Sequence, residues 1–380
     1  MNSIPAQTGT FQAWILDVDR WGDTQQMRTL AEATPGLDYE LLSLSPLRGR
    51  PPKLRRVPRH SIRWLHPNSR ALLRPPWPDV VFLGGRHAVS VALWIRRQHP
   101  RTRLVAFGRP CAPLHLFDLV LSNVVYLPPD LPNVLRLRAP LHVLDEQRLS
   151  AAKKTWRPRL RDLPRPYIAL LVGGTSAPFR FSPDEAARLG REASGLASRL
   201  GGSLLVTTNN RVSVESTRAL FNAVSVPAFL HDCREKGENP YLGFLALSDA
   251  MVVTLDSLSM MTEAAGTGVP VLIFPLEEER NLLRDGIDRL YDASMNRASL
   301  RWMHALLRRI EAQGILLRRA DRKRFAEWLV GEGHARWFSP DPAVLAGPEQ
   351  PRRLDMKGEL ERAVERLRSI LHEAPRGGAG

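Results

Sequence analysis

The stretch that most constrains the fold contains two apolar runs, at residues 250–255 and 269–274, separated by a short segment compatible with a helix. Both runs have the length and the β-branched content of buried strands. A strand–helix–strand order of this kind predicts a βαβ unit in a parallel sheet. Because ligands of open α/β sheets lie beyond the carboxyl ends of the strands, we expect the polar segment 256–259 to face a ligand.

Two small hydroxyl residues, Ser257 and Ser259, lie where the intervening helix begins. Exposed backbone N–H groups and the helix dipole favour a phosphate at such a position. Glu263 follows Ser259 by one helical turn and shares its face, which suits a nucleotide whose ribose hydroxyls donate to the carboxylate. The alternative is a capping box, in which Ser259 caps the helix and Glu263 makes only a local bond. The pattern alone does not choose between the two.

Two further predicted strands in the same half, at 167–172 and 203–207, end in polar loops. The first loop contains Gly173, Gly174 and Ser176, and its backbone N–H groups can wrap a phosphate. It lacks the Lys of a P-loop and the spacing of a dinucleotide fingerprint. The second loop contains Thr208 and Arg211. The carboxyl ends of parallel strands meet at one edge, so we expect the three loops to form one site.

The N-terminal half shows the same alternation, with strands predicted at 13–18, 79–83, 104–107, 117–121 and 134–137. Asp17, Gly22 and Asp23 lie at the end of the first strand, and Gly85 and Arg86 follow the second. The pattern predicts a doubly wound α/β sheet. Turn formation and helix capping explain these Asp residues as well as a catalytic role does.

A chain of 380 residues is long enough for two cores. Residues 146–166 are charged, punctuated by Pro and poor in strand formers, as in an interdomain linker. We therefore predict an N-terminal α/β domain at 1–150, a linker at 151–166, a second α/β domain at 167–345, and an amphipathic helix with a frayed tail at 346–380.

The charge balance favours anionic partners, since 54 Lys and Arg face 39 Asp and Glu for a net charge of +15. Nucleotide phosphates and acidic lipids fit this balance, whereas nucleic acid is not expected, because no RNA-binding, zinc-finger or helix-turn-helix pattern accompanies the charge. The basic stretch 46–78 includes Trp64 and Trp77 and is either a solvated loop or a segment that lies on an anionic membrane.

The expected location is cytoplasmic, with peripheral binding to the inner face of the membrane as a further expectation. The N-terminus has no signal-peptide pattern, and no apolar window approaches the ~18 residues of a membrane span. Cys111 and Cys233 are far apart, which favours a reducing compartment.

Several strings resemble one family when they are taken together: GGTS, LLVTTNNR and ENPYLGFLALSDAMVVTLDSLSMMTEAAGTGVPV in the second half, with PDVVFLGGRHAVSVAL and FDLV in the first. They resemble the Elm family, which is named for a plant mitochondrial-fission protein and contains many bacterial proteins assigned as glycosyltransferases. The segment DSLSMMTEAAGTGVPVLIFP is also similar to the donor-binding motif of the peptidoglycan N-acetylglucosaminyltransferase. The resemblance covers residues 14–275 and implies a GT-B-like fold, with two Rossmann-like doubly wound domains facing across a cleft.

The resemblance also implies site residues. The nucleotide would be lined by Ser257, Ser259, Met260, Thr262 and Glu263, and the diphosphate by Gly173, Gly174 and Ser176. In the family's opening motif Arg20, Gly22 and Gln26 match, but Asp23 stands where His is usual. Gly-Arg-Pro at 108–110 replaces a usual Gln-Asp-Pro.

These features lead to two functional hypotheses. The first is a glycosyltransferase that moves a sugar from a nucleotide-sugar donor to a cell-envelope or lipid-linked acceptor, with no metal and no cofactor beyond the donor substrate. Arg211 or Arg86 would offset charge on the diphosphate, Asp23 or Asp17 would be the base, and the acceptor side would include Arg20, Gly22, Gln26, Gly85 and Arg86. The second is a non-catalytic membrane-surface scaffold of the fission type, which the loss of the usual His at position 23 favours.

Overall fold

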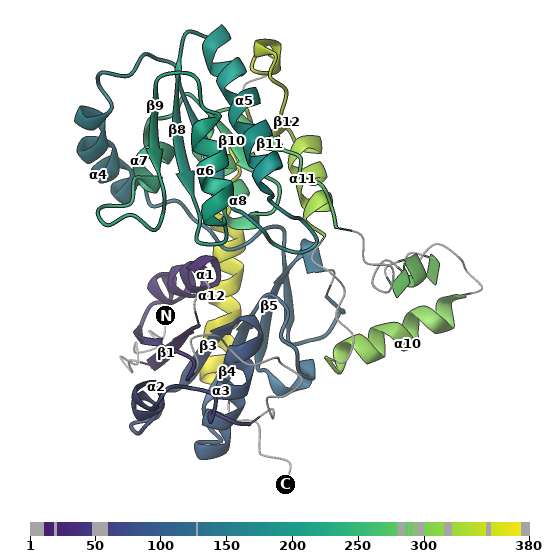
Figure 1. Cartoon of the computed structure of the whole chain (residues 1–380). Coiled ribbons are helices and arrows are strands. Elements are labelled where there is room, and N and C mark those ends of the chain that lie inside the picture. The colour runs from purple at the N-terminus through teal and green to yellow at the C-terminus, as the bar shows by residue number, and fades with distance from the viewer. Residues whose placement is uncertain are drawn as a thin grey trace, which may run out of the picture. The chain divides into compact units, whose positions relative to one another are not determined.

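The structure is a computed structural model that describes residues 11–18, 21–47, 60–126, 128–279, 286–287, 289–291, 293–294, 300–314, 321–346 and 351–373 (Figure 1). The chain forms two compact units. Unit 1 comprises Met1–Leu141, Gly286–Arg319 and Lys357–Gly380, and unit 2 comprises His142–Asp285 and Ala320–Met356. Each is built on a six-stranded parallel sheet. The predicted α/β fold with two Rossmann-like sheets is confirmed.

Unit 1 has the strand order β2-β1-β3-β4-β5-β6. Its strands are β1 (Phe11–Asp17), β2 (Leu37–Ser43), β3 (Val80–Gly84), β4 (Arg103–Phe107), β5 (Leu119–Asn123) and β6 (Val134–Leu137). Its helices are α1 (Trp21–Ala33), α2 (Pro67–Leu72), α3 (Gly85–Gln98), α10 (Arg301–Ala312) and α12 (Lys357–His372).

Successive side chains of β1 pack on opposite faces of this sheet, as the period of two in a strand requires. Ala13 and Ile15 join a core cluster with residues of α1 and α12, whereas Trp14 and Leu16 join a second cluster with residues of α3. The sheet is therefore covered on both faces, which explains why its central strands are continuous apolar runs.

Helix α12 packs on unit 1, although it follows unit 2 in the sequence. Leu367 and Leu371 are buried in the cluster shared with α1, and Leu360 and Val364 are partly buried against it. The predicted amphipathic stripe of this helix is thus confirmed as a packing face. Arg138 Nε also donates to Glu359 Oε1 of α12 at 3.2 Å.

Two features of unit 1 differ from the sequence-based expectation. Strand β2 was not predicted, because its sequence, LDYELLS, contains charged residues and no continuous apolar run. Its residues alternate irregularly between buried, half-buried and exposed. The aromatic residues of the basic stretch 46–78 lie in or against the core: Trp64 is buried, and Trp77 contacts the rings of Trp14 and Trp94. These two rings therefore take part in packing, and residues 48–59 of the basic stretch lie outside the described residues.

Unit 2 has the strand order β12-β11-β10-β7-β8-β9. Its strands are β7 (Tyr167–Val172), β8 (Ser203–Thr208), β9 (Ala228–His231), β10 (Ala250–Thr254), β11 (Val271–Phe274) and β12 (Arg336–Trp337). Its helices are α4 (Glu146–Trp156), α5 (Pro183–Arg199), α6 (Val214–Asn222), α7 (Tyr241–Leu247), α8 (Leu258–Thr267) and α11 (Arg322–Gly331).

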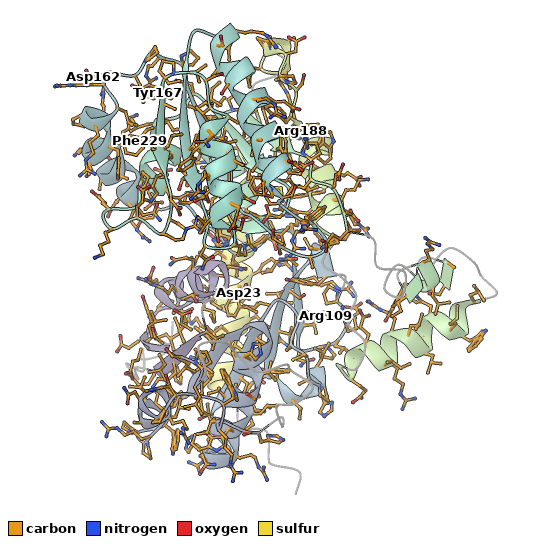
Figure 2. The ribbon with its side chains drawn as sticks, in the orientation of Figure 1. Asp23, Arg109, Asp162, Tyr167, Arg188 and Phe229 are labelled. Atoms are coloured by element: carbon orange, nitrogen blue, oxygen red, sulfur yellow. The ribbon has the colours of Figure 1, made fainter. Side chains whose placement is uncertain are left out.

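The charged segment 146–166, of which 151–166 was predicted as a linker, begins with helix α4, which packs on α7 of unit 2. The helix is capped by Asp145, whose carboxylate accepts from the N–H groups of the first turn. Its last residue, Trp156, is buried and meets Phe229 and Phe244 edge-to-face at centroid distances of 5.7 and 6.4 Å (Phe229 is labelled in Figure 2). The charged composition of this segment gave no sign of its packing, because one buried residue, Trp156, makes these contacts.

None of the described helices combines the length and apolar character needed to cross a bilayer.

Candidate functional site

Three loops meet at the carboxyl ends of β7, β8 and β10, which are neighbours in the sheet of unit 2. The three-loop site consists of residues 173–176, 208–212 and 256–259. A Cβ at Gly173 would lie 2.5 Å from Oδ2 of Asp256, and a Cβ at Gly174, whose φ is +100°, would lie 2.7 Å from the backbone carbon of Arg211. Both positions therefore require glycine, and the predicted convergence of the three strand ends is confirmed.

A buried ion pair lies at the centre of the three-loop site. Asp256 is fully buried, and its Oδ2 pairs with Nη2 of Arg211 at 3.1 Å. Its Oδ1 accepts from the hydroxyl of Thr254 at 2.7 Å, and that hydroxyl accepts from the N–H of Gly173 at 2.8 Å. Burial raises the pKa of Asp256 to about 6, while the positive charge of Arg211 acts in the opposite direction.

Arg211 is held rigidly while part of it stays accessible. Its Nε donates to the carbonyl of Gly173 at 3.2 Å, yet 38% of the side chain is exposed. A guanidinium oriented in this way can meet an anionic ligand without reorganising.

A second guanidinium reaches the same site from α11, and no local sequence pattern indicates it. Arg322 donates from Nη2 to the hydroxyl of Ser176 and from Nη1 to the carbonyl of Ala177, both at 2.8 Å. Its charge also lowers the pKa of Asp256. Because Arg322 is 146 residues from Ser176 in the sequence, only the tertiary fold brings it there.

The start of α8 has no side-chain cap among the described residues. Ser257 occupies the N-cap position, and Ser259 and Met260 in the first turn are half-buried. The capping box is wrong: Ser259 is inside the helix and Glu263 bonds elsewhere. The N–H groups of this turn remain oriented toward the loop side, as in helix starts that bind anions.

Glu263 is fixed from two sides by residues distant in the sequence. The hydroxyl of Tyr241 donates to its Oε2, and Nδ1 of His142 lies 3.2 Å from its Oε1. The side chain of Glu263 is 19% exposed. Burial and the adjacent Glu263 charge raise the pKa of Tyr241 well above its usual value, so the phenol stays a donor.

Two other residues assigned to the donor side have their hydroxyls engaged within the protein. Thr262 is buried and donates to the carbonyl of Leu258 at 2.8 Å. Thr208 is buried and lies 3.5 Å from Asp232 Oδ1, and it accepts from the N–H of Cys233 at 3.4 Å. Both stabilise the local backbone.

The residues assigned to the acceptor side lie in unit 1, at the carboxyl ends of β1 and β3. Asp17 accepts from the hydroxyl of Thr24 at 3.0 Å. Asp23, labelled in Figure 2, lies at the start of α1. It is so close to β3 that a Cβ added at Gly84 would lie 2.7 Å from the Cβ of Asp23. Two carboxylates therefore stand at neighbouring strand ends.

The remaining acceptor-side residues have structural positions. Gln26 donates to the carbonyl of Gly22 at 3.3 Å and accepts from the N–H of Leu141 at 3.0 Å. Gly85 has a φ of +74°, which permits the tight turn between β3 and α3. Arg20 and the side chain of Arg86 lie outside the described residues.

A separate buried pair lies where the family motif is replaced at 108–110. Arg109, labelled in Figure 2, pairs with Glu311 of α10, and Arg308 pairs with the same carboxylate at 2.9 Å. Burial lowers the pKa of Arg109. This pair anchors α10 to unit 1.

No cluster of three His, Cys, Asp or Glu side chains suited to a metal ion occurs in the parts of the chain that the structure describes.

Comparisons with known proteins agree with this architecture. The chain is 28% identical over 219 residues to the mitochondrial fission protein ELM1 of Arabidopsis thaliana, covering 52% of this chain and 51% of the plant protein. It is 22% identical over 299 residues to an uncharacterized protein of Rickettsia prowazekii, covering 69% of this chain and 82% of that protein. The chain thus spans about half the length of the plant relative.

Among solved structures, the chain is similar to MnaA of S. aureus, determined with UDP, with a TM-score of 0.50 and 10% identity over 97% of this chain and 99% of the other. At that identity the likeness shows the shared fold alone. The family model described as mitochondrial fission ELM1 matches residues 22–330. The chain therefore belongs to the mitochondrial fission ELM1 family.

Proposed function

We propose that the protein is a glycosyltransferase that binds a nucleotide-sugar donor in unit 2 and transfers its sugar to a cell-envelope or lipid-linked acceptor bound by unit 1. The observation that carries the proposal is the three-loop site, where Arg211 and Arg322 meet the uncapped start of α8 beside two obligatory glycines. These are groups that bind phosphate, and Glu263 lies one helical turn further along α8.

The chemistry needs charge stabilisation at the diphosphate. As the bond from the anomeric carbon to the diphosphate oxygen breaks, negative charge grows on the leaving group. Arg211 and Arg322 and the N–H groups of α8 are fixed in place, so they can stabilise this charge without a metal ion. The acceptor hydroxyl forms the new bond and gives its proton to Asp23 or Asp17.

Calorimetric titration with UDP-, GDP-, ADP- and CMP-sugars tests the donor half of the proposal. UDP-sugars lead the panel, because a protein of the same fold was solved with UDP. We expect at least one donor to bind. If a folded sample binds none of them, the proposal is refuted.

The Glu263→Ala variant tests the expected contact between this carboxylate and the ribose hydroxyls. We expect it to weaken nucleotide affinity by ~1–3 kcal/mol, because ribose hydroxyls would lose a charged partner. Glu185→Ala is the matched control, since Glu185 is also a partly buried helical carboxylate of unit 2, paired with Arg188 at 2.7 Å. An unchanged affinity in Glu263→Ala with a lower melting temperature would mean that Glu263 has only a structural role.

The exposed apolar side chains of α10 favour a second candidate, a non-catalytic scaffold on an anionic membrane surface. Trp302 and Leu306 are 68% and 49% exposed, and Arg309 on the same face is also exposed. An amphipathic helix with Trp, Leu and Arg on its outer face is suited to a membrane interface. Trp302→Ala should then reduce sedimentation with phosphatidylserine vesicles relative to neutral ones, while nucleotide binding stays absent.

A further inference from the structure

One ring nitrogen of His142 is buried without a hydrogen-bond partner among the described residues. The side chain is only 4% exposed, and the orphan atom is Nε2. Buried polar atoms in native structures are nearly always hydrogen-bonded, because an unpaired one costs the free energy of its desolvation. Because Nε2 of His142 is unpaired and lies next to the candidate site, we expect a polar group of a ligand to pair with it.

The other ring nitrogen determines what Nε2 can do. Nδ1 faces the carboxylate of Glu263 at 3.2 Å, so the hydrogen-bond network assigns a proton to Nδ1. Nε2 is then an acceptor in the neutral ring and a donor in the imidazolium. A hydroxyl group can pair with Nε2 in both states, because it both donates and accepts.

Glu263 adds a second contact point beside the first. Its Oε2 receives the hydroxyl of Tyr241 and its Oε1 faces His142, but each carboxylate oxygen has a further lone pair. A phosphate is disfavoured next to this negative charge. A metal ion is disfavoured as well, since among the described residues no third His, Cys, Asp or Glu completes a ligand cluster here.

We propose that His142 and Glu263 together bind two neighbouring hydroxyls of a ribose, with Nε2 of His142 on one hydroxyl and the Glu263 carboxylate on the other. Tyr241 is the positioning residue that holds the carboxylate. This inference rests on the proposed function, because it requires a nucleotide with its phosphates at the three-loop site. It restricts the ligand to ribonucleotides and assigns His142 a direct contact.

The test compares UDP, GDP, ADP and CMP with their 2′-deoxy and 3′-deoxy forms by calorimetry on the full chain. For the nucleotide that binds most tightly, we expect the wild-type protein to lose about 10- to 100-fold in affinity when either hydroxyl is removed. Equal affinity for the ribose and both deoxy forms overturns the inference and leaves the donor site standing. Failure of all four nucleotides to bind overturns both proposals.

Two variants separate the contact from a structural effect. His142→Asn keeps an N–H near the position of Nδ1 and removes Nε2. In this variant, the loss of affinity on removal of one of the two ribose hydroxyls, called here the deoxy penalty, should fall to below about 3-fold. His142→Gln places a polar group near Nε2 and should retain more of that penalty. The control is His231→Asn, because His231 is also buried in unit 2 with a carboxylate, that of Glu235, 3.6 Å from its Nδ1. An intact penalty in His142→Asn would show that the atom binds water only and would overturn the inference.

Discussion

The carboxyl group of Asp256 makes the stability of the protein depend on pH in a way that one isosteric change should remove. Burial raises its pKa from an ordinary value of 3.8 to about 6. A group whose pKa is raised in the folded state stabilises that state fully below pH 3.8, and this contribution is lost as the pH rises through 6. The full displacement corresponds to about 3 kcal/mol, of which roughly half lies between pH 5 and pH 8.

Asp256→Asn keeps the shape of the side chain and removes its ionisation. We therefore expect the free energy of unfolding of the variant, relative to wild type, to rise by about 1–2 kcal/mol between pH 5 and pH 8. Anion binding should weaken over the same range, because Arg211 loses its ion-pair partner. Relative stability that rises with pH, together with weaker binding, is the pattern of a residue kept for function.

Urea unfolding at pH 5, 6, 7 and 8 measures the effect, with each transition of the two-unit chain fitted separately. Asp249→Asn controls for the loss of an ion pair, since Asp249 pairs with Arg165 at 2.8 Å at the opposite end of β10 and is more exposed. A difference between Asp256→Asn and wild type that stays constant from pH 5 to pH 8 would refute the reasoning.

Two further substitutions test the close approaches seen in unit 2. Gly174→Ala should abolish nucleotide binding and should lower the melting temperature more than Gly201→Ala does. Both glycines have a positive φ, but an added Cβ would meet backbone atoms within 3 Å only at Gly174. Equal shifts of the two variants in a thermal melt would contradict this. Gly243→Ala should destabilise unit 2 by about 1–3 kcal/mol in urea, because its Cβ would lie 2.4 Å from the ring of Trp156. Pairing it with Trp156→Leu should recover part of the loss, and simple additivity of the two changes would count against a direct clash.

The parts of the fold that could be predicted from sequence are those dictated by local pattern. The apolar runs at β7, β8 and β10 and the polar residues that follow them were enough to predict the three-loop site, because strand direction in a parallel sheet fixes which ends meet. Strand β2 could not be predicted, since an edge strand with exposed Asp38 and Glu40 has no continuous apolar run.

The partners within the site were not predictable for a different reason. Tyr241 and His142 lie 22 and 121 residues from Glu263, and Arg322 lies 146 residues from Ser176. No periodicity links positions so far apart, so only tertiary packing brings them together. The capping-box alternative for Glu263 was wrong for the same reason. It considered only residues close in sequence, whereas the carboxylate contacts Tyr241 and His142, which are distant.

The central claim is that a nucleotide-sugar binds at the three-loop site of unit 2, and hydrogen exchange tests it most directly. The measurement follows the full chain by mass spectrometry with and without a saturating concentration of the tightest-binding nucleotide-sugar. We predict slower exchange in peptides that contain 173–176, 208–212 and 256–259, and unchanged exchange in α12. Slower exchange confined to other segments, or no change at the three loops under saturation, would contradict the account.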